Sequence, residues 1–440
     1  MIALRHLASQ RLPSVHRRSL SIVAGVQEHD VVLLRQQGKK GPKWTLTAPV
    51  RAGARIRLAL GRSVAADHLL GKRLLDRVLD SGGFPVVVHE ASLTNYVLHS
   101  SFERLAVPIY PHDANTIVSL LDLHPARPGE DDDALQQQAA DGLTPPFEVF
   151  EAGTGMGSLT LHLARALHAA NPPVPPDLRR TICAAPAIRD PSSAGVALEP
   201  EDQAVYDSYR ASRRLVLHSL DQSAERVKAA CKFVRHFRRA LYFPTIDFHI
   251  GTVGAYMSQR LAASSGQPFL SRAVLDVASP EESAASVLQA LHPGGLLVVF
   301  QPSISQIASF DVWAKTNQPV QLEKVLELPV GTLMDGLNDA GGGRPWSVKM
   351  FRTKEDKEVQ VLRPKVGLRV MGGGFVAVYR RWPIREMAAE SVPEKQESDE
   401  SSLSDTVMET QSEPESESDE EPEQPDTEPK HQPEPEMGKL

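Results

Sequence analysis

The stretch FEVFEAGTGMGSLTLHLARAL, residues 147–167, runs from an apolar segment through three glycines into a helix-like pattern. Gly153, Gly155 and Gly157 leave the backbone bare, which permits a tight turn and lets a ligand touch the main chain. The helix that follows would direct free N–H groups and the positive end of its dipole at this turn. We therefore expect a strand–loop–helix unit that binds a cofactor with an adenosine and an anionic or carboxylate group.

The spacing of the glycines separates the cofactor classes. G-x-G-x-G is neither the dinucleotide pattern G-x-G-x-x-G nor a P-loop, which would end in Gly-Lys-Ser/Thr. Glu151, directly before the loop, would repel a phosphate but can accept a hydrogen bond from an ammonium group. This combination indicates S-adenosylmethionine and argues against a nicotinamide dehydrogenase. A structural turn that binds no ligand remains the alternative.

Two acids end later strand-like runs. Asp221 closes LVLHSLD, and an acid at the carboxyl end of a parallel strand commonly accepts hydrogen bonds from ribose hydroxyls. Asp276 closes the fourth strand in LDVASP, a usual position for a residue that faces both cofactor and substrate. A carboxylate there can accept a hydrogen bond from an exocyclic amine. For each acid the alternative is a helix cap or turn residue.

The chain divides into regions of different pattern. Residues 101–383 alternate strand-like and helix-like segments, which predicts a mostly parallel sheet with helices on both faces. Residues 28–100 read as short strands broken by Gly, Pro and charged turns, typical of a small β-barrel or sandwich. Residues 126–146, acidic and polar, and 171–203, rich in Pro, Ala and Ser, are expected to be mobile surface insertions.

Charge is distributed unevenly along the 440 residues. The net charge of −7 combines a segment at 384–440, with 19 acidic and 4 basic side chains, and a remainder of +8. We expect the acidic segment to be disordered; a brake on nucleic-acid binding is the alternative. Residues 1–27 contain four Arg and no acid, which resembles a mitochondrial transit peptide, with a disordered basic arm as the alternative.

Composition excludes several classes. No apolar run approaches the roughly 20 residues that span a bilayer, so we expect a soluble protein without a membrane partner. Cys183 and Cys231 are too few for a disulfide scaffold and cannot form a zinc site without several other ligands. We expect two reduced thiols and no metal.

Five blocks together resemble the tRNA (adenine-58-N1) methyltransferases, catalytic-subunit type. The blocks are IYPHD (109–113), EAGTGMGSLT (151–160), HSLDQSAERVKAA (218–230), LDVASP (275–280) and FQPSISQI (300–307). The resemblance covers about residues 28–383 apart from the two insertions. It implies an α/β, Rossmann-like class I methyltransferase domain preceded by a small N-terminal β-domain.

The resemblance also implies roles for individual residues. Asp276 would be catalytic and meet the target adenine, Asp221 would hold the ribose in a slot where the family usually has Glu, and Tyr110 and Gln306 would lie near the pocket mouth. Gly251 stands where the family commonly has Asp, so its backbone or His249 would serve the cofactor's adenine. The implied cofactor-binding residues are Glu151, Gly153, Gly155, Met156, Gly157, Ser158, Asp221, Arg226, Gly251 and Asp276.

The implied function is S-adenosylmethionine-dependent methylation of N1 of adenine 58 in the T-loop of tRNA. Members of the family assemble as homotetramers or as heterotetramers with a non-catalytic subunit. The transit-like N-terminus favours the mitochondrial matrix, and the nucleus is the alternative. The competing hypotheses are a methyltransferase acting on another RNA or a non-RNA substrate, and a non-catalytic tRNA-binding subunit.

Overall fold

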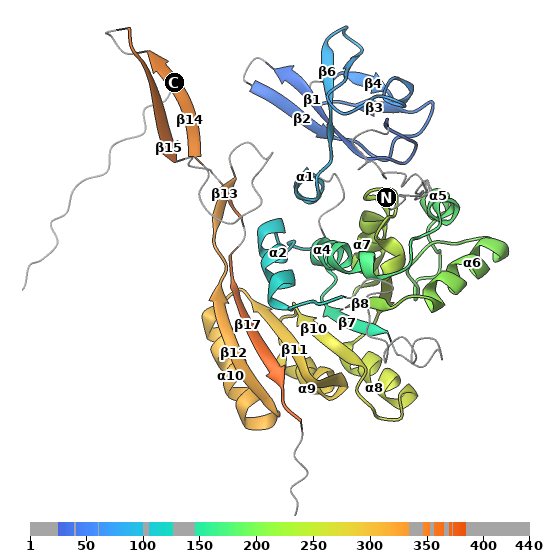
Figure 1. Cartoon of the computed structure of the whole chain (residues 1–440), viewed down its shortest axis with the longest axis vertical. Helices are drawn as coiled ribbons and strands as arrows, with labels where there is room; N and C mark the ends of the chain where they lie inside the picture. Colours follow the sequence, from blue (N-terminus) through green and yellow to red (C-terminus); the bar gives the residue numbers. More distant parts are fainter. Residues whose placement is uncertain are drawn as a thin grey trace, which may run out of the picture. The chain divides into compact units, whose positions relative to one another are not determined.

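The computed structural model describes two sheets with their helices and several short hairpins (Figure 1). Residues 1–24, 126–145 and 384–440 lie outside the described residues, as do most of the expected transit peptide, most of the acidic insertion and the acidic C-terminal segment. Residues 25–27, expected to end the transit peptide, are described, and Val26 is buried in the core of the β-domain, so the boundary predicted at residue 27 is wrong. The described ranges are 25–38, 41–59, 61–99, 105–125, 146–333, 346–352, 356–364, 369–371 and 373–383.

The N-terminal domain contains a four-stranded antiparallel sheet in the order β2-β1-β6-β5. Val86 and Val88 of β6 are fully buried and pack with Leu34 of β1. This two-residue period is typical of a sheet that has one covered face. The elements are β1 (Val32–Gly38), β2 (Gly41–Leu46), β3 (Arg55–Arg57), β4 (Ser63–Ala65), η1 (Ala66–His68), β5 (Arg77–Leu79) and β6 (Pro85–Glu90).

Helix α1 (Leu93–His99) packs into the core of the second domain and also contacts β2 of the N-terminal sheet. The Tyr96 hydroxyl donates a 2.7 Å hydrogen bond to the carbonyl of Phe233, and the Tyr96 ring lies 4.7 Å from the Phe233 ring. The sequence predicts a boundary near residue 100; these contacts group α1 with the core of the second domain.

The second domain contains a seven-stranded mixed sheet in the order β12-β17-β11-β10-β7-β8-β9. Five neighbouring strands are parallel, and β17 pairs antiparallel with both β11 and β12. The predicted Rossmann-like methyltransferase fold is confirmed. The strands are β7 (Phe147–Ala152), β8 (Leu215–Asp221), β9 (Ile246–Ile250), β10 (Leu270–Leu275), β11 (Leu291–Gln301), β12 (Val320–Glu327) and β17 (Phe375–Arg381).

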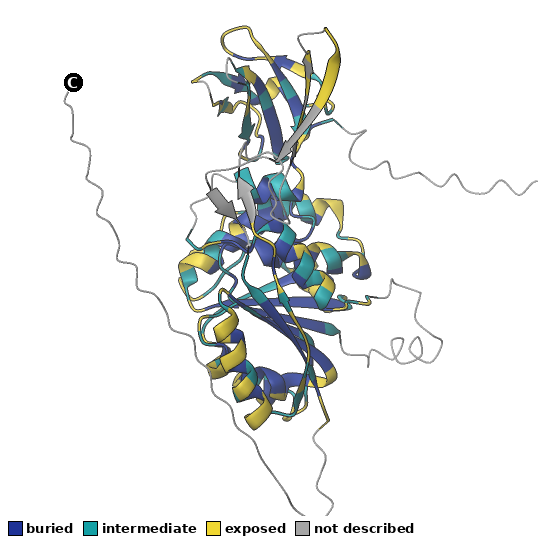
Figure 2. Cartoon of the chain, turned by 90° about the vertical axis from the view of Figure 1, so that its left-hand side faces the viewer, coloured by how far each residue is buried: buried dark blue, intermediate teal, exposed yellow. Residues whose placement is uncertain are grey.

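Helices cover both faces of this sheet, and its strands are mostly buried (Figure 2). Val149 of β7 faces the core under α1, α2, α4, α5 and α7, whereas Phe150 faces the core under α8, α9 and α10. The helices are α2 (Pro111–Leu120), α4 (Ser158–Leu167), η2 (His168–Ala170), α5 (Pro176–Ala184), α6 (Pro200–Ala211), α7 (Ala224–His236), η3 (Phe243–Thr245), α8 (Val253–Ala263), α9 (Glu281–Ala290) and α10 (Ile304–Asn317).

The side of the sheet on which successive strands are added changes at β7. From β7 the chain adds β8 and β9 on one side of the sheet, and it then returns to add β10 and β11 on the other. Such a switch point opens a crevice at the carboxyl ends of the two central strands, β7 and β10. Two antiparallel hairpins follow β12 in the sequence: β13 (Gly331–Leu333) with β16 (Arg369–Met371), and β14 (Trp346–Arg352) with β15 (Glu358–Pro364).

Part of residues 171–203, expected to form a mobile surface insertion, is packed into the second domain instead. Leu178 and Ile182 of α5, four residues apart on one helix face, are buried in its core. Asn171 fixes the start of the segment, because its side-chain oxygen accepts a 2.9 Å hydrogen bond from the Leu215 N–H. The Pro-rich composition concealed this short amphipathic helix.

Among the described helices, none has the length and apolarity required for a bilayer span.

Candidate active site

A cavity of about 660 Å³ opens at the carboxyl ends of β7, β8 and β10, where the chain changes direction. This volume falls in the range of small-molecule and cofactor sites. Its lining comes from the glycine loop, the starts of α7, α8 and α9, and the segment before α2. The lining residues are Ala106, Val107, Ala152, Gly153, Gly155, Leu220, Asp221, Gln222, Ser223, Arg226, Val253, Asp276, Val277, Ala278, Ser279, Glu282 and Ser283.

All three loop glycines adopt a left-handed backbone conformation in the tight turn predicted from the sequence. The φ angles of Gly153, Gly155 and Gly157 are 95°, 52° and 85°, values that side chains disfavour. At Gly153 space is also limiting: an added Cβ would lie 2.1 Å from the main-chain oxygen of Asp276. The loop therefore turns directly against the end of β10, and Gly153 and Asp276 both line the cavity.

Asp221 connects β8 to the glycine loop. Its carboxylate accepts hydrogen bonds from the N–H of Gly155 at 3.1 Å and of Ser223 at 2.9 Å. The N-cap of α7 is Ser223, whose hydroxyl accepts from the Arg226 N–H. Asp221 thus holds the loop and still borders the cavity, and the ribose contact stays a prediction.

Acidic groups dominate the charge of the cavity wall. Asp221, Asp276 and Glu282 line it, with Arg226 the single cation among the lining residues. Burial raises the pKa of Asp276 to about 7, and the negative charge of Asp221 adds to the rise. A positively charged ligand would relieve this repulsion and return Asp276 to its ionised form. This charge pattern suits a sulfonium and an ammonium group better than a phosphate.

Glu151 does not line the cavity. It is fully buried on the α4 side of β7, where one carboxyl oxygen accepts hydrogen bonds from Thr160 at 2.6 Å and Ser219 at 2.7 Å. The other oxygen has no partner among the described residues. Burial raises the pKa of Glu151 to about 8, so the side chain is mostly neutral at pH 7. Glu151 supports the loop from beneath in this structure.

The structure brings five of the predicted site residues together in the cavity wall: Gly153, Gly155, Asp221, Arg226 and Asp276. The remaining ones lie around it. Met156 is buried in the core, Gly157 precedes α4 as its N-cap, Ser158 donates a 2.6 Å hydrogen bond to the Ile109 carbonyl, and Gly251 donates its N–H to the Asp221 carbonyl at 3.1 Å.

His249, the alternative to Gly251, also points elsewhere. Its ring packs 4.5 Å from the ring of Tyr256, and its Nε2 is hydrogen-bonded to Nδ1 of His218 at 3.1 Å. Burial, and then the neighbouring His218, lowers the pKa of His249 to about 3. The side chain is committed to this network between β8, β9 and α8. Tyr110 is the N-cap of α2, and Gln306 is exposed on α10; neither lines the cavity.

Gln301, at the end of β11, is a residue that sequence reasoning missed. Its side-chain amide is 1 % exposed and donates a 2.8 Å hydrogen bond to the carbonyl of Val277. The segment that carries Asp276 is therefore held between Gly153 on one side and Gln301 on the other. The sequence could have indicated this role, because Gln301 is a polar residue at the end of the otherwise apolar run LLVVF.

The residues of the cavity fit S-adenosylmethionine by two observations. Gly153 and Gly155 present main chain without side chains to the cavity, and the acidic lining complements a cationic donor. Within the described residues no group of three or more His, Cys, Asp or Glu could hold a metal ion. The cavity thus offers main-chain and carboxylate contacts to an organic cation.

Comparisons with known proteins agree with this chemistry. The chain is 26% identical over 300 residues to tRNA (adenine(58)-N(1))-methyltransferase TrmI of Thermus thermophilus, and the match covers 68% of this chain and 78% of the relative. The TrmI protein of a second strain of the same species matches equally. The chain is similar to TrmI methyltransferases. No family model matches it.

Two solved structures also match. A SAM-dependent O-methyltransferase from Thermotoga maritima is 14% identical with a TM-score of 0.49, covering 82% of this chain and 97% of that one. The tRNA (m1A58) methyltransferase TrmI from Aquifex aeolicus is 14% identical with a TM-score of 0.44, covering 82% and 99%.

Replacing Glu151 by Gln should change how stability depends on pH. The pKa of Glu151 is about 8 in the folded protein against an ordinary 4.5, so the unfolded chain releases this proton first. Wild-type protein therefore loses stability as the pH rises from about 4.5 to 8, by on the order of 4 kcal/mol from this group. Glu151→Gln should lose less; melting temperatures at pH 5 and pH 8 measure this. Identical pH dependence in both proteins would contradict the assignment.

Replacing Gln301 by Met should impair turnover without loss of cofactor. Met preserves the volume but cannot donate to the Val277 carbonyl, so the segment that carries Asp276 loses its outer restraint. We expect kcat to fall roughly tenfold while the Kd for S-adenosylmethionine changes little. Gln321→Met, at an exposed position of β12, is the matched control. Equal kcat values for the two variants would remove the positioning role.

Proposed function

We propose that the protein methylates N1 of adenine 58 in the T-loop of tRNA, with S-adenosylmethionine as methyl donor. The observation that carries the proposal is the placement of Asp276 against the glycine loop in the wall of one cavity. The similarity to TrmI of Thermus thermophilus supports the tRNA substrate. S-adenosylmethionine supplies an electrophilic methyl group on a sulfonium.

The cavity residues bind and orient both partners. The loop at Gly153 and Gly155 offers main-chain contacts to the donor, and Asp221 is placed for its ribose. The acceptor N1 lies on the Watson–Crick edge, so the target adenine must be unpaired and turned out of its stack. Alignment of N1 with the methyl group, away from water, is the main contribution expected of the protein.

Asp276 acts on the charge that develops. When N1 gains a methyl group the adenine becomes cationic and its exocyclic amine becomes more acidic. An ionised Asp276 accepts a hydrogen bond from this amine, orients the base and stabilises the positive charge. Because the pKa of Asp276 is about 7, this role requires loss of its proton, which a bound sulfonium favours.

The proposal also includes the compartment in which the protein acts and the way it assembles. The acid-free, Arg-containing residues 1–27 support a mitochondrial form. A homotetramer would supply a composite surface for a folded tRNA; the alternative is a nuclear assembly with a non-catalytic subunit. Size measurement of the purified protein with and without tRNA separates these assemblies.

Asp276→Asn should abolish most turnover while cofactor binding persists. The amide cannot accept the bond as an anion, so we expect kcat to fall about 10²- to 10³-fold, with the Kd for S-adenosylhomocysteine within a few-fold of wild type. Wild-type kcat/KM should rise with pH through about 7 as Asp276 ionises, and the variant should lack this rise.

The assay uses transcribed tRNA with adenine 58 and a matched transcript in which that base is replaced. Methylation of the first transcript alone supports the proposal. Equal methylation of both would indicate another substrate. Undiminished methylation by folded Asp276→Asn would remove the catalytic role, and no binding of S-adenosylmethionine by wild type would favour a non-catalytic subunit.

A further inference from the structure

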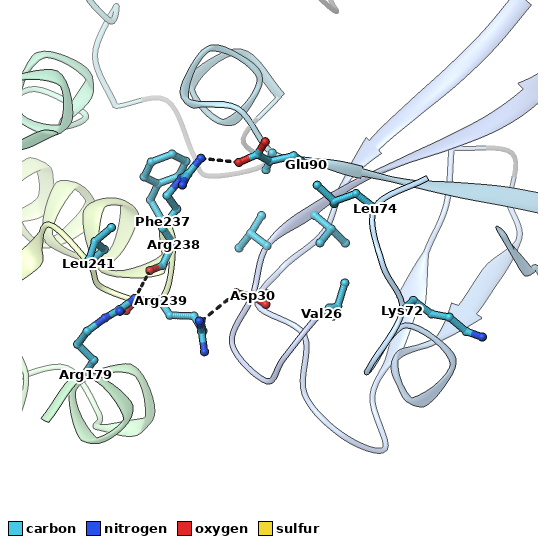
Figure 3. A pocket seen from close by; sticks show the side chains of 13 residues that line it. Val26, Asp30, Lys72, Leu74, Glu90, Arg179, Phe237, Arg238, Arg239 and Leu241 are labelled. Carbon is cyan, nitrogen blue, oxygen red and sulfur yellow. Dashed lines mark hydrogen bonds and ion pairs between the residues drawn. The ribbon is translucent and has the colours of Figure 1, made fainter. Parts of the chain in front are cut away.

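A second cavity, of about 210 Å³, lies between the β-domain and the catalytic domain (Figure 3). Asp30, Lys72 and Glu90 line it from the β-domain; Arg179 of α5 and the pair Arg238–Arg239 line it from the catalytic domain. Four cations line the cavity: Lys72, Arg179, Arg238 and Arg239. Arg51 and Arg235 lie outside the lining, but their charges act on His29 together with that of Arg239. We call these six side chains the arginine crease. Its function is not explained by the chemistry of the active site.

The backbone after α7 is strained to form this crease. Arg238, Arg239 and Ala240 have φ angles of 45°, 52° and 56°, three consecutive left-handed residues without a glycine. Each such residue costs about 1–2 kcal/mol, and runs of them are rare. Arg179 stabilises the turn, because its guanidinium donates to the carbonyls of Arg238 at 2.8 Å and Arg239 at 3.2 Å. Strain that is held in this way is typical of functional segments.

The strained turn directs two arginines at the β-domain. Arg238 forms an ion pair with Glu90, and Arg239 forms one with Asp30 at 3.1 Å (Figure 3). Arg239 also donates a hydrogen bond to the side-chain oxygen of Gln27. These contacts join the two domains within one compact unit. They also neutralise two of the six cations; the other four form no ion pair with a carboxylate of the described residues.

The positive charge of the crease exceeds its acidic counterpart. Within the described residues, Arg51, Lys72 and Arg179 form no ion pair with a carboxylate, and Arg51 and Lys72 are exposed. Arg235 is 8 % exposed; its guanidinium donates to the Ala185 carbonyl, and its Nε has no partner in the described part of the chain. Burial, and then the charge of Arg51, lowers the pKa of the adjacent His29. The crease therefore retains unneutralised positive charge.

Helix α7 connects the crease to the active-site cavity. Arg226, in its first turn, lines that cavity, and Arg235 lies in its last turn. Nine residues of helix separate them, about 14 Å along the helix axis. The active-site cavity and the crease therefore lie at opposite ends of the same helix.

We propose that the arginine crease binds phosphates of the RNA substrate and so helps to hold it while the target base enters the cavity. This inference rests on the proposed function, because the RNA is the polyanion which that function brings to the surface. Phosphodiesters carry one negative charge per nucleotide, and cations that neutralise them release bound counterions on association. The exposed Lys72 and Arg51 are the side chains free to make such contacts.

The test uses full-length protein, transcribed tRNA and fluorescence anisotropy between about 50 and 200 mM salt, a range in which phosphate contacts are measurable. Lys72→Ala and Arg51→Ala should each weaken tRNA binding roughly 3- to 10-fold and make the slope of log K against log salt shallower by about 1. Both side chains are exposed and form no ion pair within the described residues, so folding is not at risk. Cofactor affinity and kcat at saturating tRNA should stay unchanged.

Lys43→Ala is the matched control, because Lys43 is an exposed lysine of β2 outside the crease lining. Wild-type affinity and slope in this control, with losses in the two crease variants, support the inference. If both crease variants bind tRNA with the affinity and the salt slope of the control, and the protein still methylates tRNA, the inference about the crease is wrong. The proposed function would then still stand. A wild-type protein that neither binds nor methylates tRNA overturns the proposed function as well.

Discussion

The close approach of Gly153 to the end of β10 is the contact on which the candidate site depends. A Cβ at position 153 would lie 2.1 Å from the Asp276 oxygen, so any side chain would force the glycine loop and β10 apart. With glycine there, the loop proposed to bind the cofactor and the carboxylate proposed to meet the substrate border the same cavity. The Gln301 amide holds the other side of the Asp276 segment, and Asp221 holds the loop through the Gly155 N–H.

The buried acids of this region lower the stability of the protein without ligand, and we infer that they serve ligand binding. Glu151 and Asp276 have pKa values of about 8 and 7, because both are buried near other acids. Cations neutralise neither group in the described residues, whereas Asp247, elsewhere on the same sheet, is paired with Arg213 and Arg210. A cationic ligand in the cavity would supply the missing positive charge, and perturbed acids of this kind commonly mark functional sites.

The sequence predicted the parts of the fold that follow from local pattern. The alternation of apolar runs and helices, the bare loop and the acids at strand ends all depend on residues near one another in the chain. The sequence could not show that α5 would pack into the core, because Pro and Ala in residues 171–203 obscure two apolar residues four apart. It also could not show which face of β7 carries Glu151, or that His249 and His218 pair across strands. Those outcomes depend on register and tertiary packing.

The most direct measurement is the affinity for S-adenosylhomocysteine of Gly153→Ala compared with Gly266→Ala, both shown to be folded. Gly266 also has a positive φ, of 79°, but an added Cβ meets nothing within 4 Å, so this variant isolates the backbone cost. The account predicts at least a tenfold loss of affinity in Gly153→Ala, which is about 1.4 kcal/mol, and near wild-type affinity in Gly266→Ala. Wild-type affinity in Gly153→Ala would contradict it.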